Sequence, residues 1–399
     1  MQFQKKSMNN LFEKINSHNF FLDRPLEILH HKHSTLFPIK KINTSLLKKG
    51  ATVNLCGGLL KSDMTFCDFA KTIRIPPDYS DLVFNDWYIN PPLNKEAIQN
   101  YNYIDEDVVF IGPMSVHYGH FITEGLSRLW LLLDSNYKDL KIAYISEAER
   151  DKFNEFFLLF GIKKSNIIRI NEPTKFKSII VPEPSIRLHD YCHEMYGETI
   201  TQILKNVKLI DEKDIFLTKK ATRWTGKSIG EKYIQKVFLR NGFEIVCPEE
   251  YSIDEFLSLM LSAKTLVASS GTSAHNAVFM KKQSELICLN RSDHHHHLQI
   301  MINKIRDLKV THVDTSFNVF NNPNLANGPF NIVITSYLLD FLRRESFKLP
   351  SKLFIAYTFL KSTSYYLLYT FFLQKMIYTF MKIKIRLQNE FNKILKGRT

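Results

Sequence analysis

The sequence predicts an α/β protein with mostly parallel strands, and three observations support this prediction. Between about residue 107 and residue 290, short apolar runs of strand length alternate with segments of helical periodicity, the order found in parallel sheets covered by helices. Hydrophobic residues make up 44% of the chain and charged residues 23%, a composition that excludes a disordered chain or a collagen-like fibre. The 399 residues suffice for about two to three domains.

The first alternating series extends from residue 107 to residue 207 and opens with an apolar strand at 107–113. A helical stretch is expected next, from His117 to about Leu133. The elements that follow are a strand at 141–146, a helix at 147–161 closed by Gly161, strands at 166–170 and 175–182, and a helix at 191–207. Residues 1–105 are poorly periodic and indicate no element.

The second alternating series opens with a strand at 214–220. It continues with a helix at 230–241 that Asn241-Gly242 stops, a strand at 243–248, a helix at 253–263, a strand at 265–269, a helix at 274–280 and a strand at 285–290. This compact βαβαβ set is the pattern of a Rossmann-like domain. The charged stretch near 208–213 is the expected boundary, so we predict domains at 1–207 and 208–335 and a helical tail at 336–399.

The basic excess of the chain lies at its C-terminal end. The net charge is +13, and residues 343–399 carry 12 Lys or Arg against 2 Asp or Glu, a net charge of +10. The preceding 342 residues are therefore nearly neutral, at +3. A nucleic-acid-binding protein more often carries a basic face on its folded domain, so we expect no nucleic-acid partner.

The tail has the composition of an amphipathic helix that lies on a membrane surface. Its uncharged runs between Lys352, Lys361 and Lys375 are 8 and 13 residues long, too short for the roughly 20 apolar residues of a spanning helix. A helix would carry one basic stripe on an aromatic background, made of Lys361, Lys375, Lys382, Arg386 and Lys393. We expect residues 350–399 to bind an anionic membrane surface peripherally. The alternative is a helix that packs on the protein body or on a partner chain.

The cysteine pattern and the first residues indicate where in the cell the protein is expected. Five cysteines are scattered without a C-x-x-C pair, so neither a zinc knuckle nor a thioredoxin-type redox site is indicated, and free thiols fit a reducing cytosol. The first residues contain no apolar run of the kind found in signal peptides. We therefore expect a cytoplasmic protein, peripheral at the inner face of the cytoplasmic membrane.

A segment at 112–133 combines acid–base side chains with an apolar pattern. His117, His120, Glu124 and Arg128 follow one another at i, i+3, i+7 and i+11, so a continuous helix would place them on one face. One interpretation is the solvent face of an amphipathic helix. The other is that Glu124 orients His120 and raises its basicity, so that the imidazole deprotonates a sugar hydroxyl. The residue types leave both interpretations open.

A second segment, residues 267–280, joins a strand to a helix through small residues. The turn is Ser269-Ser270-Gly271-Thr272-Ser273. Glycine lets a ligand approach the backbone, and the start of the next helix offers N–H groups to a phosphate. An ordinary turn with a Ser or Thr helix cap is the alternative. Neither G-x-G-x-x-G nor G-x-x-x-x-G-K-[ST] is present.

Together these segments resemble glycosyltransferase family 61 over about residues 107–290. The family's N-Y-Y-H-F-x-x-E-x-L-x-R-L segment is matched by residues 117–129, its strand with two basic residues and a later arginine by 216–223, and its GFE strand by 242–250. Its last motif is a V-G-x-H-G-A-G-x-x-N turn, matched in register by Val267, Gly271, Asn276 and Phe279. Ser270 replaces the histidine of that turn, and Ser273 replaces its second glycine.

The resemblance implies a GT-B-like fold, in which two Rossmann-like domains face each other across a cleft, the second holding a nucleotide sugar and the first presenting the acceptor. It implies an inverting reaction with His120 as the base and Glu124 as its orienter. Lys219 and Arg223 would neutralise the departing diphosphate without a metal, and Glu249 would bind ribose or base. The other donor-binding residues that the resemblance implies are Ser270, Gly271, Thr272, Ser273 and Asn276.

We expect no metal cofactor. The acidic triplet at 105–107 precedes a strand, where a metal-binding D-x-D motif would follow one, so we interpret it as a solvated turn. The run His294–His297 has the side chains to hold a transition metal. A polar loop is the preferred interpretation, because runs of potential ligands often lack the outer hydrogen-bond partners that a metal site needs.

These features predict an inverting glycosyltransferase that uses a nucleotide-sugar donor. Its acceptor would be a growing bacterial surface glycan, capsule or lipopolysaccharide, free or lipid-linked, at the cytoplasmic membrane. One alternative is a sugar-phosphate transferase. The other is a non-catalytic scaffold subunit of a capsule-assembly complex, which the changes at Ser270 and Ser273 keep open.

Overall fold

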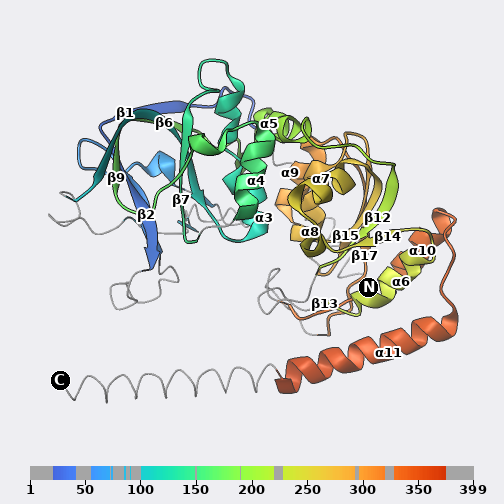
Figure 1. The fold of residues 1–399 in the computed structure, drawn as a ribbon. Coiled ribbons are helices and arrows are strands. Elements are labelled where there is room, and N and C mark those ends of the chain that lie inside the picture. The colour runs from blue at the N-terminus through green and yellow to red at the C-terminus, as the bar shows by residue number, and fades with distance from the viewer. Residues whose placement is uncertain are drawn as a thin grey trace, which may run out of the picture.

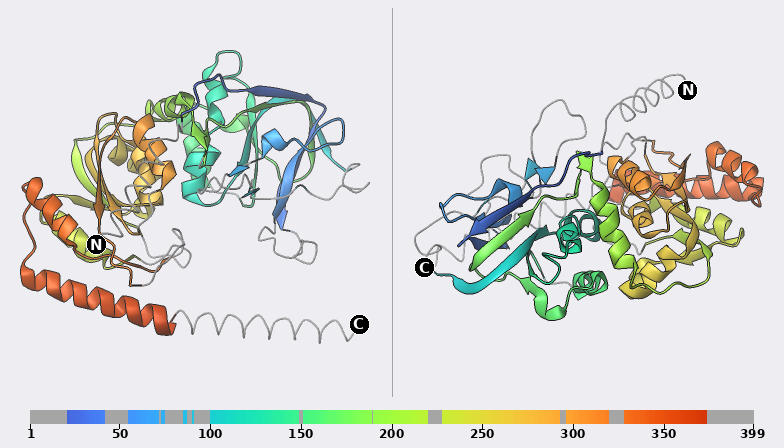
Figure 2. Two further views of the ribbon diagram at one scale, coloured as in Figure 1. Left: turned by 180° about the vertical axis from the view of Figure 1, so that it is seen from behind. Right: turned by 90° about the horizontal axis from the view of Figure 1, so that it is seen from above.

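The computed structural model describes residues 21–41, 55–71, 73–74, 85–86, 90, 100–148, 151–188, 190–219, 228–292, 296–319 and 328–373. Two β-sheets lie side by side, with helices packed between them (Figure 1). The view from above shows the same arrangement, with helices between the two sheets and further helices beyond the second one (Figure 2). Both sheets contain parallel strands, so the fold is mixed α/β, as predicted.

The first sheet mixes parallel and antiparallel strands in the order β3-β2-β9-β6-β7-β8, with β1 paired to β9. Its strands are β1 (Ile28–Lys32), β2 (Thr35–Lys41), β3 (Leu55–Leu60), β6 (Asn102–Met114), β7 (Lys141–Ser146), β8 (Ile167–Arg169) and β9 (Thr174–Pro182). The strands from β6 to β9 are parallel, and β1, β2 and β3 pair antiparallel. Sequence periodicity does not indicate β1, β2 or β3.

The second sheet is entirely parallel, in the order β14-β12-β15-β16-β17. Its strands are β12 (Lys213–Leu217), β14 (Glu244–Val246), β15 (Ala263–Ser269), β16 (Glu285–Asn290) and β17 (Lys309–Asp314). This confirms the predicted βαβαβ series and adds β17 at one edge. The order of strands reverses between β12 and β15, and open α/β sheets bind ligands beside such a reversal, at the carboxyl ends of the strands.

Helices cover both faces of the second sheet and one face of the first. The longer helices of the described chain are α4 (Asp151–Phe160), α5 (Glu194–Leu204), α6 (Glu231–Leu239), α7 (Ile253–Leu261), α9 (His297–Ile305), α10 (Ser336–Arg344) and α11 (Lys352–Leu368). Shorter elements are α3 (Tyr118–His120), α8 (Thr272–His275), 3-10 turns at 68–70, 129–133, 164–166, 248–250 and 276–279, and π-helical turns at 121–125 and 369–373. Two-residue strands pair β4 (Ile73–Arg74) with β5 (Asn85–Asp86), β10 (Ile186–Arg187) with β11 (Tyr191–Cys192), and β13 (Ser228–Ile229) with β18 (Phe330–Asn331).

Alternating side chains along each strand hold the layers together. In β12, Ile215 and Leu217 join the apolar cluster between the two sheets, and Phe216 joins the cluster on the opposite face, with side chains of α6 and α10. In β6, Val109 and Phe110 likewise lie on opposite faces. Successive strand residues point to opposite sides of a sheet, so each apolar run buries both of its faces.

The apolar cluster between the sheets is continuous from the first sheet to the second. It contains buried side chains of β6, β7, α4 and α5 together with those of α7, β15 and α9. The ring centroids of Phe156 in α4 and Phe279 after α8 lie 5.8 Å apart, and Arg306 after α9 donates to the Thr201 hydroxyl of α5 at 3.2 Å. The boundary predicted near residue 208 is therefore a change of sheet and not a gap in the packing.

The helix expected from His117 to about Leu133 is broken. α3 covers only Tyr118–His120, a π-helical turn covers Phe121–Gly125, and a separate 3-10 turn covers Leu129–Leu133. The Leu126 N–H bonds to the Phe121 carbonyl, five residues back, at 3.1 Å. This widened turn ends the regular periodicity, so Arg128 does not share a helical face with His120, and that prediction is wrong.

The first part of the predicted tail belongs to the protein body. Leu338, Phe341 and Leu342 of α10 are buried in the apolar cluster on the outer face of the second sheet. An amphipathic helix with this apolar stripe packs against the sheet because burial removes the stripe from water. The segment that begins at residue 336 is therefore not membrane-facing along its whole length.

α11 lies along the second half of the molecule (Figure 1). On its inner face Ser362 and Tyr366 are buried and the Thr363 hydroxyl accepts a hydrogen bond from Asn331, as the packed-helix interpretation requires. On its outer face Leu353 is 81% exposed and Leu360 is 65% exposed. No helix among the described residues is long and apolar enough to cross a bilayer. Four of the five residues of the predicted basic stripe lie beyond residue 373, outside the described chain.

Candidate active site

The carboxyl end of β6 leads into a pair of acid–base side chains. His120 ends α3, and its Nδ1 lies 2.9 Å from Oε2 of Glu124 in the following π turn. The imidazole is partly exposed and the carboxylate is nearly buried. A carboxylate at this distance favours the tautomer with a proton on Nδ1, which leaves Nε2 as an acceptor. The pair can therefore act as a general base toward a hydroxyl group.

α3 packs directly against the turn that follows β15. The Tyr118 hydroxyl donates to Oδ1 of Asn276 at 2.9 Å, across 158 positions of sequence. A Cβ added to Gly119 would lie 2.7 Å from the Thr272 hydroxyl oxygen, so glycine is required for this close approach. The two segments singled out by the sequence thus meet in one place.

The turn after β15 has a backbone conformation that favours glycine. Gly271 has a φ of +102°, and a Cβ added to it would lie 2.6 Å from Nη2 of Arg291. The turn residues predicted to bind the donor are all partly exposed, namely Ser270, Gly271, Thr272 and Ser273. Part of each residue is thus accessible to a ligand, although the Ser270 N–H already donates to the Leu289 carbonyl at 2.9 Å.

Two other predicted donor-binding side chains follow neighbouring strands. Lys219 comes two residues after β12 and is half-buried, and Glu249 comes shortly after β14 and is exposed. Burial and the positive charge of Arg291 lower the pKa of Lys219, against the opposing effect of the Glu231 and Glu249 carboxylates. These charged groups therefore act on one another beside the point where the strand order reverses.

Arg291 is a candidate site residue that sequence reasoning missed. It directly follows β16, is 9% exposed, and its guanidinium lies 4.6 Å from the centroid of the Phe330 ring. Burial lowers the pKa of Arg291, and the Glu231 carboxylate opposes this shift. A single arginine after a strand matches no motif. The one available signal is its place at a carboxyl strand end next to the strand that carries the glycine turn.

His275 of α8 is unsuited to act as a second base. Its ring is buried, and its Nδ1 lies 2.8 Å from the Gln299 amide oxygen. Burial lowers the pKa of His275 to about 4, with a smaller effect in the same direction from the charge of His120. His275 is therefore neutral near pH 7 and stays uncharged beside the His120–Glu124 pair.

Of the remaining predicted donor-binding residues, Asn276 is buried at the contact between α3 and α8, and Arg223 is not described by the structure. Asn276 is buried, accepts from Tyr118, and donates through Nδ2 to the carbonyls of Thr272 and Ser273. Its amide therefore positions α3 against α8, and the direct donor contact expected from the sequence stays a prediction. Arg223 lies outside the described residues, as do His294 and His295 of the histidine run.

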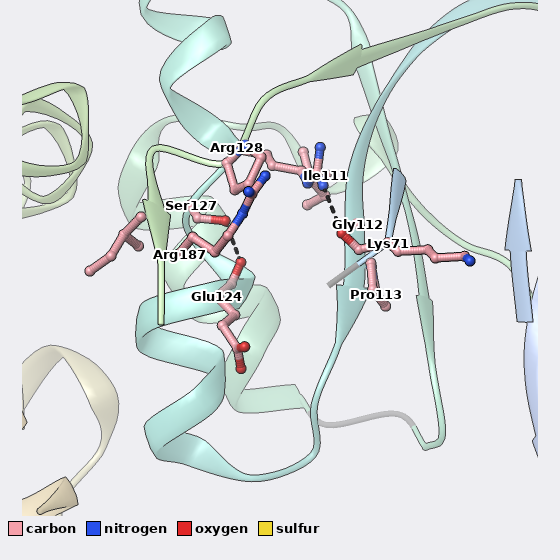
Figure 3. A pocket seen from close by; sticks show the side chains of 10 residues that line it. Lys71, Ile111, Gly112, Pro113, Glu124, Ser127, Arg128 and Arg187 are labelled. Atoms are coloured by element: carbon pink, nitrogen blue, oxygen red, sulfur yellow. Dashed lines mark hydrogen bonds between the residues drawn. The ribbon is translucent and has the colours of Figure 1, made fainter. Parts of the chain in front are cut away.

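A hollow lies where β6 and β9 end (Figure 3). Arg128 lines it and donates to the backbone carbonyls of Pro182, Phe69 and Lys71. The other labelled side chains around it include Lys71, Glu124, Ser127 and Arg187 (Figure 3). Arg128 is therefore a buried link between three chain segments and not part of a solvent face, as the amphipathic-helix interpretation would have it.

Two segments of the sequence carry potential metal ligands, the acidic triplet at 105–107 and the run His294–His297. In the described part of the chain, no three His, Cys, Asp or Glu side chains lie close enough together to hold a metal ion. The acidic triplet at 105–107 belongs to strand β6, so the expected solvated turn is wrong. Glu106 pairs there with Lys141 of β7 at 2.6 Å, since neighbouring parallel strands bring the two side chains together.

Comparisons with known proteins bear on this site. Two solved structures of TibC are similar to the chain, one a dodecameric iron-containing heptosyltransferase in complex with ADP-D-β-D-heptose and one the dodecameric glycosyltransferase from enterotoxigenic E. coli H10407. Both are 8% identical with a TM-score of 0.26, over 76% and 77% of this chain and 86% and 82% of theirs, a likeness that supports no argument about fold. A search of curated proteins gives no match. The family model of glycosyltransferase 61 matches residues 118–287, from α3 to β16, which supports the resemblance to that family seen in the sequence.

Proposed function

We propose that this protein is an inverting glycosyltransferase of GT-B type that moves a sugar from a nucleotide-sugar donor to an acceptor hydroxyl. One observation carries the proposal: the His120–Glu124 pair of the first half adjoins the glycine turn of the second half, through Gly119 and Thr272. A base and a donor site must be neighbours, because the acceptor oxygen attacks while the bond to the diphosphate breaks.

His120 supplies the base in this proposal. Its Nε2 takes the proton of the acceptor hydroxyl as the oxygen attacks the anomeric carbon, and Glu124 stabilises the imidazolium that forms. Attack from the side opposite the leaving diphosphate inverts the configuration at that carbon. A single base is enough for this reaction, which fits a site where His275 stays neutral.

The second half holds the donor. Lys219 and the hydroxyl groups of Ser270, Thr272 and Ser273 stabilise the negative charge that develops on the diphosphate. Glu249 accepts hydrogen bonds from the ribose diol. This arrangement requires no divalent metal, so we expect transfer to continue in EDTA. A complete and reversible loss of transfer in EDTA would contradict this part of the proposal.

We further propose that the acceptor is a bacterial surface glycan, capsule or lipopolysaccharide, free or lipid-linked, at the inner face of the cytoplasmic membrane. Two features support this location. The outer face of α11 exposes Leu353 and Leu360, and residues 343–399 carry a net charge of +10. Apolar side chains next to a basic segment suit the headgroup region of an anionic bilayer.

A thermal-shift screen of the full chain against UDP-, GDP-, CMP- and TDP-sugars tests the donor class. A bound donor raises the unfolding temperature by mass action, so one nucleotide class should stand out. Incubation of that donor with acceptor should then release the nucleoside diphosphate. With a UDP-, GDP- or TDP-sugar, release of the nucleoside monophosphate would indicate sugar-phosphate transfer instead. A CMP-sugar releases CMP on simple sugar transfer, so a CMP-sugar donor would contradict the proposed diphosphate leaving group. The absence of any shift would favour the non-catalytic scaffold.

A further inference from the structure

Two cationic side chains lie at the carboxyl edge of the second sheet without a salt bridge to any described residue. They are Lys219, after β12, and Arg291, after β16. Nε of Arg291 is buried and has no hydrogen-bond partner in the described part of the chain. Buried charges are ordinarily paired, because leaving a charge uncompensated in a poorly hydrated place is costly. The pair is therefore suited to bind an anion.

One buried carboxylate partly neutralises the positive charge of Lys219 and Arg291. Glu231 is the first residue of α6, is buried, and accepts a hydrogen bond from the Ser269 hydroxyl at the end of β15. Burial lowers the pKa of both Lys219 and Arg291, and the charge of Glu231 opposes that shift in each case. Because the other carboxylate that acts on Lys219, that of Glu249, is exposed, two cations and one buried carboxylate leave a net positive charge among the buried groups beside the reversal of strand order.

The geometry places this charge against the glycine turn. Nη2 of Arg291 lies where a side chain at position 271 would begin, 2.6 Å from an added Cβ, so the edge of the guanidinium meets the backbone of Gly271. The ring of Phe330 lies over the guanidinium on one face and restricts its orientation. A planar guanidinium with a fixed orientation is suited to bind one phosphate through two of its N–H groups.

We infer that Arg291 and Lys219 together bind a diphosphate, one phosphate against each cation, and that Glu231 is their counter-charge while the site is empty. This inference rests on the proposed function, since it assigns the donor's diphosphate to the pair. Arg291 would then be a donor-binding residue, and not only a side chain that packs on Phe330.

Titration calorimetry of the full chain with inorganic pyrophosphate, in metal-free buffer, tests the pair. Arg291→Gln should weaken pyrophosphate binding roughly tenfold or more, the loss expected for charge-assisted hydrogen bonds. Arg240→Gln is the matched control, because Arg240 also lies over a phenylalanine ring, that of Phe354, but at the opposite end of α6 from Glu231. It should change the affinity by less than about twofold.

Replacing the counter-charge, Glu231, should strengthen pyrophosphate binding where Arg291→Gln weakens it. Glu231→Gln removes the counter-charge while its amide oxygen still accepts from Ser269, so pyrophosphate should bind several-fold more tightly. Arg291→Lys keeps the charge without the planar guanidinium, and we expect an affinity between those of the wild type and Arg291→Gln. If Arg291→Gln fails to fold, as judged by circular dichroism, the Lys and Glu231 variants still test the inference.

Three results would overturn the inference: no binding of pyrophosphate by the wild type, wild-type affinity in folded Arg291→Gln, or weaker binding in Glu231→Gln. Its failure is distinct from failure of the proposed function. Sugar transfer at the wild-type rate and donor KM in Arg291→Gln would refute the diphosphate pair and leave the transferase standing. If pyrophosphate binding depends on Arg291 but the protein transfers no sugar, the diphosphate pair stands and the proposed transferase function is refuted.

Discussion

At the scale of single residues, the proposed reaction depends on the imidazole of His120. Replacing His120 with alanine removes the group that takes the acceptor proton, so we expect transfer to slow by ~10²–10⁴-fold. Donor affinity should not change, because the donor site is on the other sheet. Steady-state kinetics with a soluble acceptor and a thermal-shift titration with the donor measure the two effects separately.

The partner carboxylate provides the control for this variant. Glu124→Gln preserves the shape of the side chain that lies 2.9 Å from Nδ1 of His120 but loses its charge. We expect a smaller loss of rate and a displaced pH–rate profile, because Glu124 acts through the imidazole. Full activity in His120→Ala would mean that another group is the base, with Glu124 next in line.

Gly271 tests where the donor binds. In Gly271→Ala the new Cβ would lie 2.6 Å from the Arg291 guanidinium, so the arginine must move and donor affinity should fall. Gly161→Ala is the matched control, since Gly161 has a similar φ of +108° but no atom within 4 Å of an added Cβ. Both variants should lose about 1–3 kcal/mol of stability through backbone strain. Equal donor affinity in the two would place the donor elsewhere.

Local contacts at the site are predictable from the sequence, and long-range ones are not. The contact between His120 and Glu124 follows from i,i+4 spacing, which brings side chains together even in a distorted helical turn. The approach of Gly119 to Thr272 joins residues of different sheets, and the place of Arg291 depends on which strand lies next to β15. No spacing within one segment specifies such a neighbour.

At the scale of elements, the broken helix after β6 depends on Arg128. Alanine at this position would leave the backbone carbonyls of Pro182, Phe69 and Lys71 without their donor. We expect the free energy of unfolding to fall by about 3 kcal/mol or more, the cost of several buried polar groups left unpaired. Urea denaturation monitored by circular dichroism gives this value.

Arg187 is the control for that measurement, because it lines the same hollow but is partly exposed and pairs with Asp190 at 3.1 Å. Arg187→Ala should lower stability by less than about 1 kcal/mol. Equal losses in the two variants would mean that the carbonyl contacts of Arg128 do not hold the segment.

Elements with strong local patterns are the ones that the sequence predicts well. The strands at 141–146 and 285–290 have the predicted bounds, because uninterrupted apolar runs bounded by polar residues are typical of buried parallel strands. β1 and β2 are stabilised by pairing with β9, more than a hundred residues away. Their own sequences contain little periodicity, so the pattern that would reveal them lies in a distant strand.

At the scale of the whole molecule, residues 374–399 are expected to determine membrane binding. They carry seven Lys or Arg and one Glu, and each basic residue near an anionic surface contributes about 1 kcal/mol. Removing them should abolish salt-sensitive co-sedimentation with anionic vesicles. Activity on a short soluble acceptor should survive, and activity on a lipid-linked acceptor should fall.

A second variant separates the apolar contribution. Leu353→Ser with Leu360→Ser alters only exposed positions of α11, so the fold should be unaffected while the salt-resistant part of vesicle binding decreases. Neutral vesicles are the control, and they should bind neither form strongly. Equal sedimentation of the truncated and intact proteins at low salt would place the membrane contact outside this segment.

The apolar cluster that runs from β6 to β15 has a consequence for how the molecule unfolds. If one half unfolds, the apolar side chains of the other half that pack against it become exposed to water. We therefore expect calorimetry to give one cooperative unfolding transition in place of two. A nucleotide bound at the edge of the second sheet would then slow amide hydrogen exchange in β6 and β7 of the first. Nucleotide binding at the second sheet could then be measured from the amide exchange rates of the first sheet.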